Sequence, residues 1–327
     1  MSLVDDYDGL LLDLDGTVWE GGQAIPGAVD VINSCGLPSI YITNNASRSS
    51  AEVSEMLRAI GLEAQERQVV TSAQAAAKLA AQQFAAGTKA LVVGAQAFRD
   101  VVSQAGFQLV DSADDSPEVV FQGFDPEINW AALTECALAV RAGAKYFASN
   151  RDTTLPIKRG LAVGNGSLIA AVVSATGIEP VSSGKPGPEM FYQGAKLIDS
   201  EKALVVGDRL DTDIAGGVAA AMDTFHVLTG VSGPIALLEA PIDQRPTFIG
   251  ENMADLAKEA SELIPGAQGG FTARFDGEDI LLEKGDEGAT SIQALRTVLE
   301  VAWALKEPPR YIQPRSLVAE KAIEGWA

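Results

Sequence analysis

The sequence has 327 residues, of which 47% are hydrophobic and 21% are charged. This is the composition of a globular chain that is long enough to form two or three packed units without disulfides. Its 44 acidic and 24 basic residues give a formal net charge of −20. This balance argues against nucleic-acid binding, which needs a basic surface.

The N-terminus has no basic segment before its short apolar run, so it does not resemble a signal peptide. No other run reaches the roughly 18 apolar residues of a membrane span. The two cysteines, Cys35 and Cys136, fit a reducing compartment. We therefore expect a cytoplasmic protein with no membrane partner.

Apolar runs alternate with helical patterns along the first half of the chain. The runs that predict strands lie at 9–15, 38–44, 89–94, 118–124 and 145–150. The patterns that predict helices lie at 49–62, 71–87, 95–106, 130–143 and 167–177. Because strands separated by helices pair in parallel, this order predicts an α/β fold with mostly parallel sheets.

The alternation continues to about residue 264, and then the pattern changes. Residues 271–285 predict a hairpin that turns at Asp276 and Gly277, and residues 290–307 and 311–327 predict helices. We interpret 267–327 as a small accessory unit. The apolar face of its first helix must pack on its own hairpin, on the core or on a second subunit, and packing within the accessory unit is the favoured hypothesis.

Acidic residues follow two of the apolar strands. Asp13 and Asp15 end the first run, and in an open α/β sheet ligands bind beyond the carboxyl ends of the strands. Two carboxylates on one side of a strand repel each other unless a cation relieves them or one is protonated. An acidic turn after a strand is the simpler alternative for this motif alone.

A second acidic cluster, Asp208 to Asp213, favours the cation. Asp208 ends another buried strand and can join Asp13 and Asp15 around one hard ion, for which Mg²⁺ is the best fit. Asp213 is interpreted as a residue that orients Lys185 or a metal-bound water. The alternative is that Asp211 and Asp213 cap the following helix.

Two further segments could bind a phosphate group. Thr43, Asn44 and Asn45 follow a strand, where a hydroxyl and backbone amides can hold phosphate oxygens, although they could equally cap a helix. Lys185 lies in a tight loop and could neutralise charge in a transition state. A lysine in a loop is otherwise usually solvated. Such local positive charge would offset the repulsion between an acidic protein and a phosphate ester.

The segments LLLDLDGTVW, IYITNNASRS, SSGKPGPEMF and VVGDRLDTDIAGG together resemble the four ordered motifs of the haloacid dehalogenase superfamily. Their spacing, with FHVLTGVS and ASNRDTTLP, is similar to its NagD-like, para-nitrophenylphosphatase branch, which includes chronophin and phosphoglycolate phosphatase. The resemblance covers residues 7–262. It implies a Rossmann-like core formed by residues 1–82 and 180–264, with an α/β cap of the C2 type inserted at 83–179.

The resemblance also implies the roles of the site residues. Asp13 matches the nucleophile that forms an aspartyl-phosphate, and Asp15 matches the general acid and base. The Asp13 carboxylate, the Asp15 backbone carbonyl and Asp208 would hold Mg²⁺. Thr43, Asn44 and Asn45 match the phosphate-binding motif, and Lys185 matches its lysine.

Substrate choice is expected to lie in the cap, in the loop that contains Asp152 and Leu155. Chronophin-like relatives resemble this loop but carry a histidine at the Leu155 position, whereas phosphoglycolate phosphatase-like relatives carry leucine. This favours glycerol phosphate or phosphoglycolate, with pyridoxal phosphate, a sugar phosphate or a nucleotide as alternatives. Leu155 could also simply pack within the cap. A homodimer is a further expectation.

Other classes of protein fit less well. The segment around Gly164 and Gly166 lacks the third glycine of a dinucleotide site, and no P-loop occurs. His226 is the single histidine, which excludes a zinc site with more than one histidine. A receiver-like module that accepts phosphate would not need Asp15 or the cap. A phosphomutase would carry its cap between the first two motifs.

Overall fold

The computed structural model describes residues 2–157 and 159–326. The chain divides into two compact units, one formed by 1–39 with 200–327 and the other by 40–199. The second unit is thus inserted between two segments of the first. Each unit is described below by itself.

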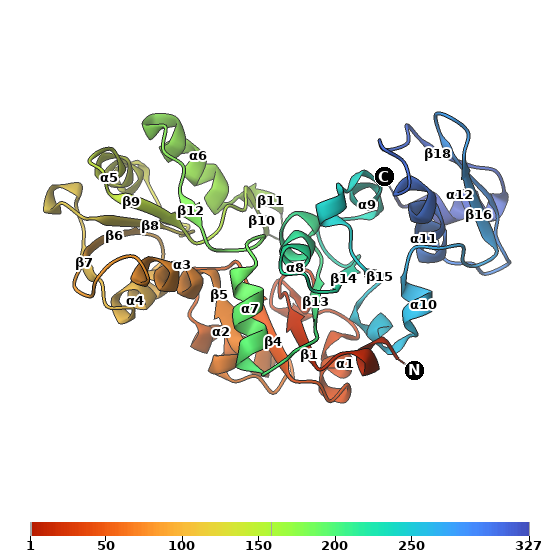
Figure 1. Cartoon of the computed structure of the whole chain (residues 1–327), viewed down its shortest axis with the longest axis horizontal. Coiled ribbons are helices and arrows are strands. Elements are labelled where there is room, and N and C mark those ends of the chain that lie inside the picture. The colour runs from red at the N-terminus through yellow and green to blue at the C-terminus, as the bar shows by residue number, and fades with distance from the viewer. Residues whose placement is uncertain (1, 158, 327) are drawn as a thin grey trace. The chain divides into compact units, whose positions relative to one another are not determined.

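The first unit is built on a parallel sheet whose strands run in the order β15, β14, β13, β1 (Figure 1). These strands are β1 (Gly9–Leu12), β13 (Ala203–Gly207), β14 (Thr224–Val227) and β15 (Phe248–Gly250). All of their residues are buried. Burial on both faces explains why the strands are uninterrupted apolar runs in the sequence.

The register of this sheet brings the ends of its strands together. Leu12 pairs with Val206, and Gly207 pairs with His226. Asp13, Asp208 and the loop after β14 therefore leave the sheet at the same carboxyl edge. This is the edge at which open α/β sheets bind ligands.

Short helices and a small hairpin complete the core of the first unit. The helices are α1 (Ala28–Ser34), α8 (Ala215–Ala219), α9 (Pro234–Glu239) and α10 (Ala260–Leu263), with the short helical segments η1 (Leu3–Asp6), η4 (Leu210–Ile214), η5 (Ile242–Gln244) and η6 (Met253–Ala257). The hairpin is formed by β2 (Trp19–Glu20) and β3 (Gln23–Ala24). It lies between the first and second motifs, where the sequence pattern predicts no strand.

The C-terminal segment forms a three-stranded sheet with two helices (Figure 1). These elements are β16 (Phe271–Phe275), β17 (Ile280–Lys284), α11 (Ser291–Ala302), β18 (Ile312–Pro314) and α12 (Leu317–Ile323). The accessory unit and its hairpin are confirmed, since β16 and β17 are antiparallel. The prediction of a wholly helical end is wrong, because β18 pairs with β17 before α12 begins.

The apolar face of α11 packs on its own sheet and on the core at the same time. Leu295 and Leu299 are fully buried in one hydrophobic cluster with Phe271 of the hairpin and with Leu237 and Ile249 of the core. The Arg296 guanidinium is also buried there and donates to the Ile249 carbonyl through Nε at 3.0 Å. The favoured hypothesis, packing within the accessory unit alone, is therefore incomplete, because the same face also packs on core residues.

The second unit contains a parallel pair of strands and a five-stranded sheet in the order β12, β9, β8, β6, β7. The parallel pair is β4 (Ser39–Thr43) and β5 (Val69–Thr71). The five strands are β6 (Lys89–Val93), β7 (Gln108–Val110), β8 (Val119–Gln122), β9 (Lys145–Ala148) and β12 (Val181–Ser182). The helices are α2 (Ser50–Ala59), α3 (Ser72–Ala81), α4 (Gln96–Gln104), α5 (Trp130–Arg141), α6 (Asn165–Thr176) and α7 (Glu189–Leu197), with the short segments η2 (Glu66–Gln68) and η3 (Ala113–Asp115).

Helices cover both faces of the five-stranded sheet (Figure 1), and alternate residues of its strands are buried against them. Val92 and Phe121 belong to a cluster with α3 and α4, whereas Leu91 and Val120 belong to a cluster with α5 and α6. This is the period of two that a strand imposes on its side chains. The α/β fold with parallel sheets is confirmed.

Two details of this unit differ from the predictions. The helix predicted over 71–87 ends at Ala81, and the chain turns before β6. A hairpin of β10 (Thr154–Ile157) and β11 (Gly160–Val163) follows β9, and no strand was predicted there. Pro156 and Gly160 interrupt these two segments in the sequence, and such residues argue against a strand.

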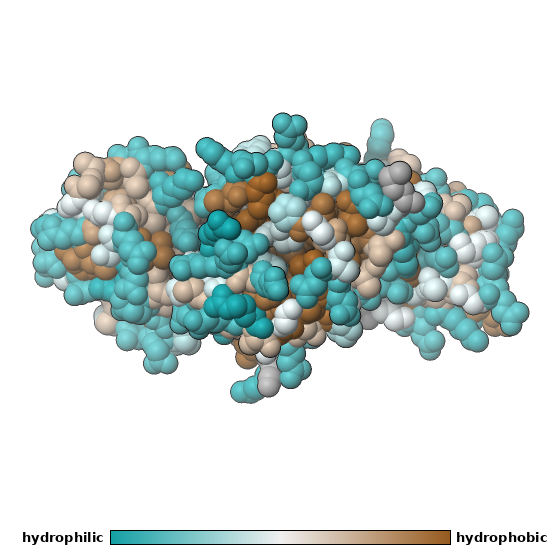
Figure 2. Space-filling model, turned by 90° about the horizontal axis from the view of Figure 1, so that it is seen from below, coloured by the Kyte–Doolittle hydropathy of each residue, from teal (hydrophilic) through white to brown (hydrophobic). Residues whose placement is uncertain are grey.

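No helix in the described part of the chain is long and apolar enough to cross a membrane. On the face drawn in Figure 2, hydrophilic residues cover most of the surface and hydrophobic residues are exposed in patches.

Candidate active site

Three carboxylates converge at the carboxyl edge of the first unit's sheet. Asp13 follows β1, Asp208 follows β13, and Asp213 lies in the single π-helical turn η4. One carboxylate oxygen of each lies within 4.8 Å of the other two. Asp208 and Asp213 are buried, at 0% and 1% exposure. Asp213 therefore lies beside the candidate metal ligands Asp13 and Asp208.

The turn after β1 fits closely against Asp208. The Asp13 amide donates to the Val206 carbonyl at 2.9 Å, and the Thr17 hydroxyl lies 3.3 Å from Asp13 Oδ2 and 3.5 Å from Asp208 Oδ1. Gly16 has a φ of +93°, and a Cβ there would lie 2.6 Å from Asp208 Oδ2. Glycine is therefore required by the backbone conformation and by the space.

Asp15 lies outside this cluster of carboxylates. Its Oδ1 accepts a hydrogen bond from Trp19 Nε1 at 2.9 Å, and its side chain is exposed. The strand ends at Leu12, so the alternation of a strand does not extend to Asp15. The Asp13 and Asp15 carboxylates thus have different surroundings, as two groups with different chemical tasks require.

Neutral donors hold the second acidic segment in place. The Val231 amide donates to Asp208 Oδ2 at 2.7 Å, and the Arg209 amide donates to Asp213 Oδ2 at 3.1 Å. Asp211 points elsewhere and forms an ion pair with the Arg209 guanidinium at 3.0 Å. Arg209 is the residue that precedes η4, so the helix-cap alternative fits Asp213 in part, and it does not fit Asp211.

The convergent carboxylates fit a divalent cation. Three acidic groups this close repel one another, and two of them are buried, where water screens the repulsion poorly. Carboxylate oxygens are the ligands that Mg²⁺ prefers. The donor set of Asp13, Asp208 and Asp213 therefore suits Mg²⁺.

In the second unit, Thr43 is the last residue of β4, and Asn44 and Asn45 follow it. The Thr43 hydroxyl accepts from the Asn45 amide at 3.0 Å, and the Asn45 side chain accepts from the Ser47 amide at 2.8 Å. The helix α2 that follows is capped by Ser49. The helix-cap interpretation of the three residues is therefore wrong.

Asn44 and Lys185 form one buried network. Asn44 Oδ1 accepts from the Lys185 amide at 2.9 Å, and Asn44 Nδ2 donates to the Lys185 carbonyl at 3.2 Å. Lys185 is 3% exposed, and its Nζ donates to the Ile42 carbonyl at 3.2 Å. A buried ammonium group is costly without an anion nearby, so this lysine differs from a solvated surface residue.

The two predicted cap residues take different positions. Asp152 is half-buried, and its carboxylate oxygens accept from Asn44 Nδ2 at 3.1 and 3.2 Å. Leu155 lies half-buried in β10. The second unit thus brings Asp152, Asn44 and Lys185 together by hydrogen bonds.

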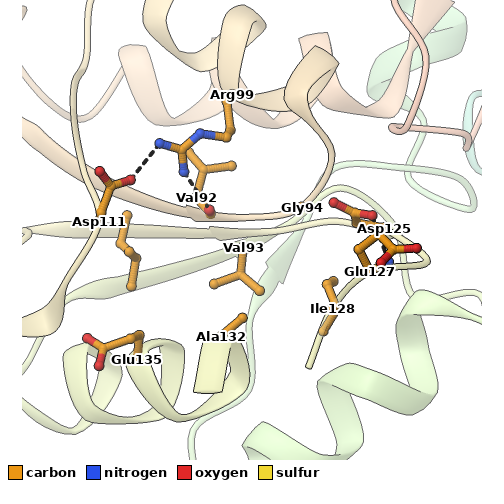
Figure 3. Close-up of a pocket in the computed structure, with 11 residues that line it drawn as sticks. Val92, Val93, Gly94, Arg99, Asp111, Asp125, Glu127, Ile128, Ala132 and Glu135 are labelled. Atoms are coloured by element: carbon orange, nitrogen blue, oxygen red, sulfur yellow. Dashed lines mark hydrogen bonds and ion pairs between the residues drawn. The ribbon is translucent and has the colours of Figure 1, made fainter. Parts of the chain in front are cut away.

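A cavity of about 220 Å³ lies at the end of the five-stranded sheet (Figure 3). Its charged lining residues are Arg99, Asp111, Asp125, Glu127 and Glu135. None of the predicted site residues lines it. Four carboxylates against one guanidinium give it the wrong charge for a phosphate ester.

Several residues around the acidic cluster were missed at the sequence level. Thr17 belongs to the first motif but was given no role, and Thr229 and Ser232 lie in the loop after β14. His226 was given no role in the site, and the structure places it fully buried within β14. Burial lowers its pKa to about 4, so the ring is neutral at neutral pH.

Comparison with known proteins identifies the family. Residues 10–108 match the family model of haloacid dehalogenase-like hydrolases, and residues 182–256 match a second model of HAD-like hydrolases. A D-glycerol 3-phosphate phosphatase of Mycobacterium tuberculosis is 40% identical over all of this chain and 96% of its own length. The chain belongs to the haloacid dehalogenase-like hydrolases.

Solved structures agree with this assignment. Glycerol phosphate phosphatase from M. tuberculosis, crystallised with magnesium, matches with a TM-score of 0.93 and 38% identity over 100% of this chain and 99% of its own. NagD from Escherichia coli K-12 matches with a TM-score of 0.68 and 30% identity over 76% of this chain and 97% of its own. The predicted class is confirmed: this chain is a magnesium-dependent phosphatase that hydrolyses small phosphate esters through an aspartyl-phosphate.

The family models end at residue 256, before the accessory unit begins. The M. tuberculosis relative nevertheless aligns over the whole chain. The accessory unit thus lies outside the family models, in agreement with a resemblance that covers residues 7–262, but this relative shares it.

Proposed function

We propose that this chain hydrolyses glycerol 3-phosphate to glycerol and inorganic phosphate. The observation that most supports this proposal is the 40% identity to a D-glycerol 3-phosphate phosphatase over the whole chain, accessory unit included. An acid sugar phosphatase of Staphylococcus saprophyticus, by contrast, is 33% identical over 78% of the chain.

Charge also favours glycerol phosphate over phosphoglycolate. Phosphoglycolate carries a carboxylate in addition to its phosphate, and the protein has a net charge of −20. Glycerol adds only neutral hydroxyl groups, which donate hydrogen bonds to acidic or amide oxygens. Leu155 stands where chronophin-like relatives carry a histidine, which supports a small substrate over the pyridoxal phosphate of the alternative.

For the chemistry, we propose that Asp13 attacks the phosphorus atom. A P–O bond forms to the carboxylate as the ester P–O bond breaks, and Asp15 gives its proton to the leaving glycerol oxygen. Asp15 then takes a proton from water, which attacks the aspartyl-phosphate, releases inorganic phosphate and restores Asp13. The exposed Asp15 carboxylate, separate from the acidic cluster, supports this division of tasks.

Positive charge at the phosphate has two proposed sources. Bound Mg²⁺ would supply charge that stabilises the transition state, held by the Asp13 and Asp208 carboxylates and by the backbone carbonyl of Asp15. Lys185, with Thr43, Asn44 and Asn45, would hold the phosphate oxygens. The burial of Lys185 supports this role, since an anion would offset its desolvation.

We propose that residues 83–179 act as the cap that selects the leaving group, over a core formed by 1–82 and 180–264. Asp152 and Leu155 would contribute to that selection. In the described conformation the Asp152 carboxylate accepts from Asn44, so it also orients the proposed phosphate-binding amide.

We further propose a cytoplasmic location and a homodimer. Both cysteines are free thiols, which fits a reducing compartment. Light scattering would test the dimer, and a mass equal to one chain would reject it.

A substrate panel tests the proposal. Rates of phosphate release from glycerol 3-phosphate, phosphoglycolate, pyridoxal phosphate, glucose 6-phosphate and AMP would be compared as kcat/KM. We expect glycerol 3-phosphate to rank first, and Leu155→His to move the preference toward pyridoxal phosphate. A first rank for any other ester would reject glycerol 3-phosphate as the substrate.

A further inference from the structure

The loop after β14, residues 228–233, contacts both sides of the acidic cluster. It leaves the sheet beside β15, where the Leu228 amide donates to the Gly250 carbonyl at 3.1 Å. It carries none of the residues to which the four motifs assign a role. Its contacts nevertheless reach Asp208 and the turn after Asp13.

On one side, the loop holds Asp208 at two points. The Val231 amide donates to Asp208 Oδ2 at 2.7 Å, and the Ser232 amide donates to the Asp208 carbonyl at 3.1 Å. Bonds to both the side chain and the backbone of Asp208 leave its carboxylate a single orientation. A Cβ at Gly230 would lie 1.9 Å from Asp208 Oδ2, so only glycine lets the loop approach this closely.

On the other side, the loop holds the turn that follows Asp13. The Thr229 hydroxyl donates to the Gly16 carbonyl at 2.6 Å. This six-residue loop therefore fixes the positions of two segments that are nearly 200 residues apart in the sequence. These segments supply two of the three convergent carboxylates.

His226 holds the loop itself. Its ring Nε2 lies 2.8 Å from the Ser232 carbonyl, and because a carbonyl only accepts, Nε2 carries the proton of this bond. The Ser232 hydroxyl accepts from the Leu210 amide at 3.1 Å, which ties the same residue to the acidic segment. An apolar residue in β14 could fill the space of His226 but could not hold Ser232.

We propose that His226 and Thr229 are positioning residues of the magnesium site. His226 fixes the loop through Ser232, and the loop fixes the Asp208 carboxylate and the turn after Asp13. Neither residue touches the reacting atoms. Their effect is on the affinity for Mg²⁺, through the orientation of the ligands.

The test compares variants of the full chain by their affinity for Mg²⁺ without substrate. His226→Leu removes the donor and keeps the bulk, His226→Gln restores an N–H donor, and Thr229→Val removes one hydroxyl. Phe225→Leu is the matched control, since Phe225 is the fully buried neighbour of His226 in β14 and its side chain points to the opposite face of the strand. Calorimetric titration with MgCl₂ gives the dissociation constant, and thermal unfolding in EDTA gives the stability without metal.

We expect His226→Leu and Thr229→Val to weaken Mg²⁺ binding about 10-fold or more, and His226→Gln to recover part of it. At saturating Mg²⁺, the KM for para-nitrophenyl phosphate should stay within twofold. The Phe225→Leu control should lower the unfolding temperature but leave the Mg²⁺ dissociation constant unchanged.

Two results would overturn the proposal. One is a Mg²⁺ affinity within twofold of wild type in both His226→Leu and Thr229→Val, whatever their stability. The other is an equal loss of Mg²⁺ affinity in Phe225→Leu, which would mean that general destabilisation is the cause. If His226→Leu fails to fold, Thr229→Val decides alone, because it changes one hydroxyl in a partly exposed loop.

Discussion

Two edges of the molecule gather acidic residues in the same topological position. In the first unit, Asp13 and Asp208 follow parallel strands β1 and β13. In the second, Asp111 and Asp125 follow parallel strands β7 and β8 beside the cavity of Figure 3. The number of acidic residues at strand ends therefore does not distinguish the two edges.

The hydrogen-bond and ion-pair partners of the carboxylates do distinguish the two edges. At the second edge Asp111 pairs with the Arg99 guanidinium at 2.7 Å, and Glu135 accepts from the Ser112 hydroxyl at 3.1 Å. Each carboxylate is turned toward its own donor. Among the described residues, only the first edge brings three carboxylates within 4.8 Å of one another. Convergence of the oxygens, and not acidity alone, distinguishes a metal site.

The largest expected effect is that of Asp13→Asn. Loss of the proposed nucleophile should lower kcat for para-nitrophenyl phosphate by about 10⁴-fold or more at any Mg²⁺ concentration. Asp125→Asn, an equivalent change at the second edge, should leave kcat within twofold. Near-normal activity in Asp13→Asn would refute the aspartyl-phosphate on this residue.

Asp208→Asn should have the next largest effect, and on Mg²⁺. The variant keeps the size and the hydrogen bond to the Val231 amide but loses the charge, so its Mg²⁺ dissociation constant should rise by roughly 100-fold or more. EDTA should abolish wild-type activity, and Mg²⁺ should restore it. An unchanged Mg²⁺ dissociation constant in Asp208→Asn would show that this residue is not a ligand of the site. A raised Mg²⁺ dissociation constant in Asp125→Asn would show that the two edges do not differ as proposed.

Part of this contrast could be predicted from sequence. Acids directly after an apolar run are a local signal, and it placed Asp13 and Asp208 at one edge. The roles of His226 and Thr229 could not be predicted, because they depend on a loop folding back onto another strand. Lys185 was predicted to bind phosphate, but its burial could not be predicted, since burial of a loop depends on tertiary packing.

The same difference between local and tertiary signals explains which parts of the fold could be predicted. Long apolar or amphipathic runs were recognised, because periodicity over ten residues is a strong signal. β18 and the hairpin of β10 and β11 were not predicted, because these short segments show neither an uninterrupted apolar run bounded by turns nor a clear alternation of apolar and polar residues. The contact of Leu295 with core residues was only one of three alternatives, because an apolar face does not specify its partner.

Binding of Mg²⁺ should protect the first edge and not the second. At 100 times the dissociation constant the bound ion stabilises the folded state by about 2.7 kcal/mol. Amide hydrogen exchange should slow at 13–17, 207–213 and 228–233 and stay unchanged at 91–94 and 125–135. Equal protection at both edges would show that the second also binds the ion.

A smaller effect is expected from Arg99→Met, which removes the one guanidinium of the second edge. Asp111 is 85% exposed, so losing this ion pair should cost less than about 1 kcal/mol of unfolding free energy. In Arg99→Met the second edge becomes more acidic, but its carboxylate oxygens still do not converge. A newly gained Mg²⁺ site in this variant, detected by calorimetry in a background of Asp208→Asn, would contradict the contrast.

The smallest effect concerns Cys136, which follows Glu135 on α5. Burial raises the pKa of its thiol to about 12, so it should stay protonated and unreactive toward a disulfide reagent at pH 8. Cys35 is partly exposed and should react first. The count of reactive thiols should be one with or without Mg²⁺, and two after unfolding. Exposure of Cys136 on addition of Mg²⁺ would reveal opening of the second edge.

The inserted position of residues 40–199 has a consequence for the newly made chain. Domains fold as units, and the N-terminal ones fold first during synthesis. The ribosome completes the 40–199 unit before it makes β13, the strand that pairs with β1. Asp13 is translated long before Asp208 and the loop after β14. A nascent chain therefore completes its metal centre only after the whole 40–199 unit and the loop after β14 have been made.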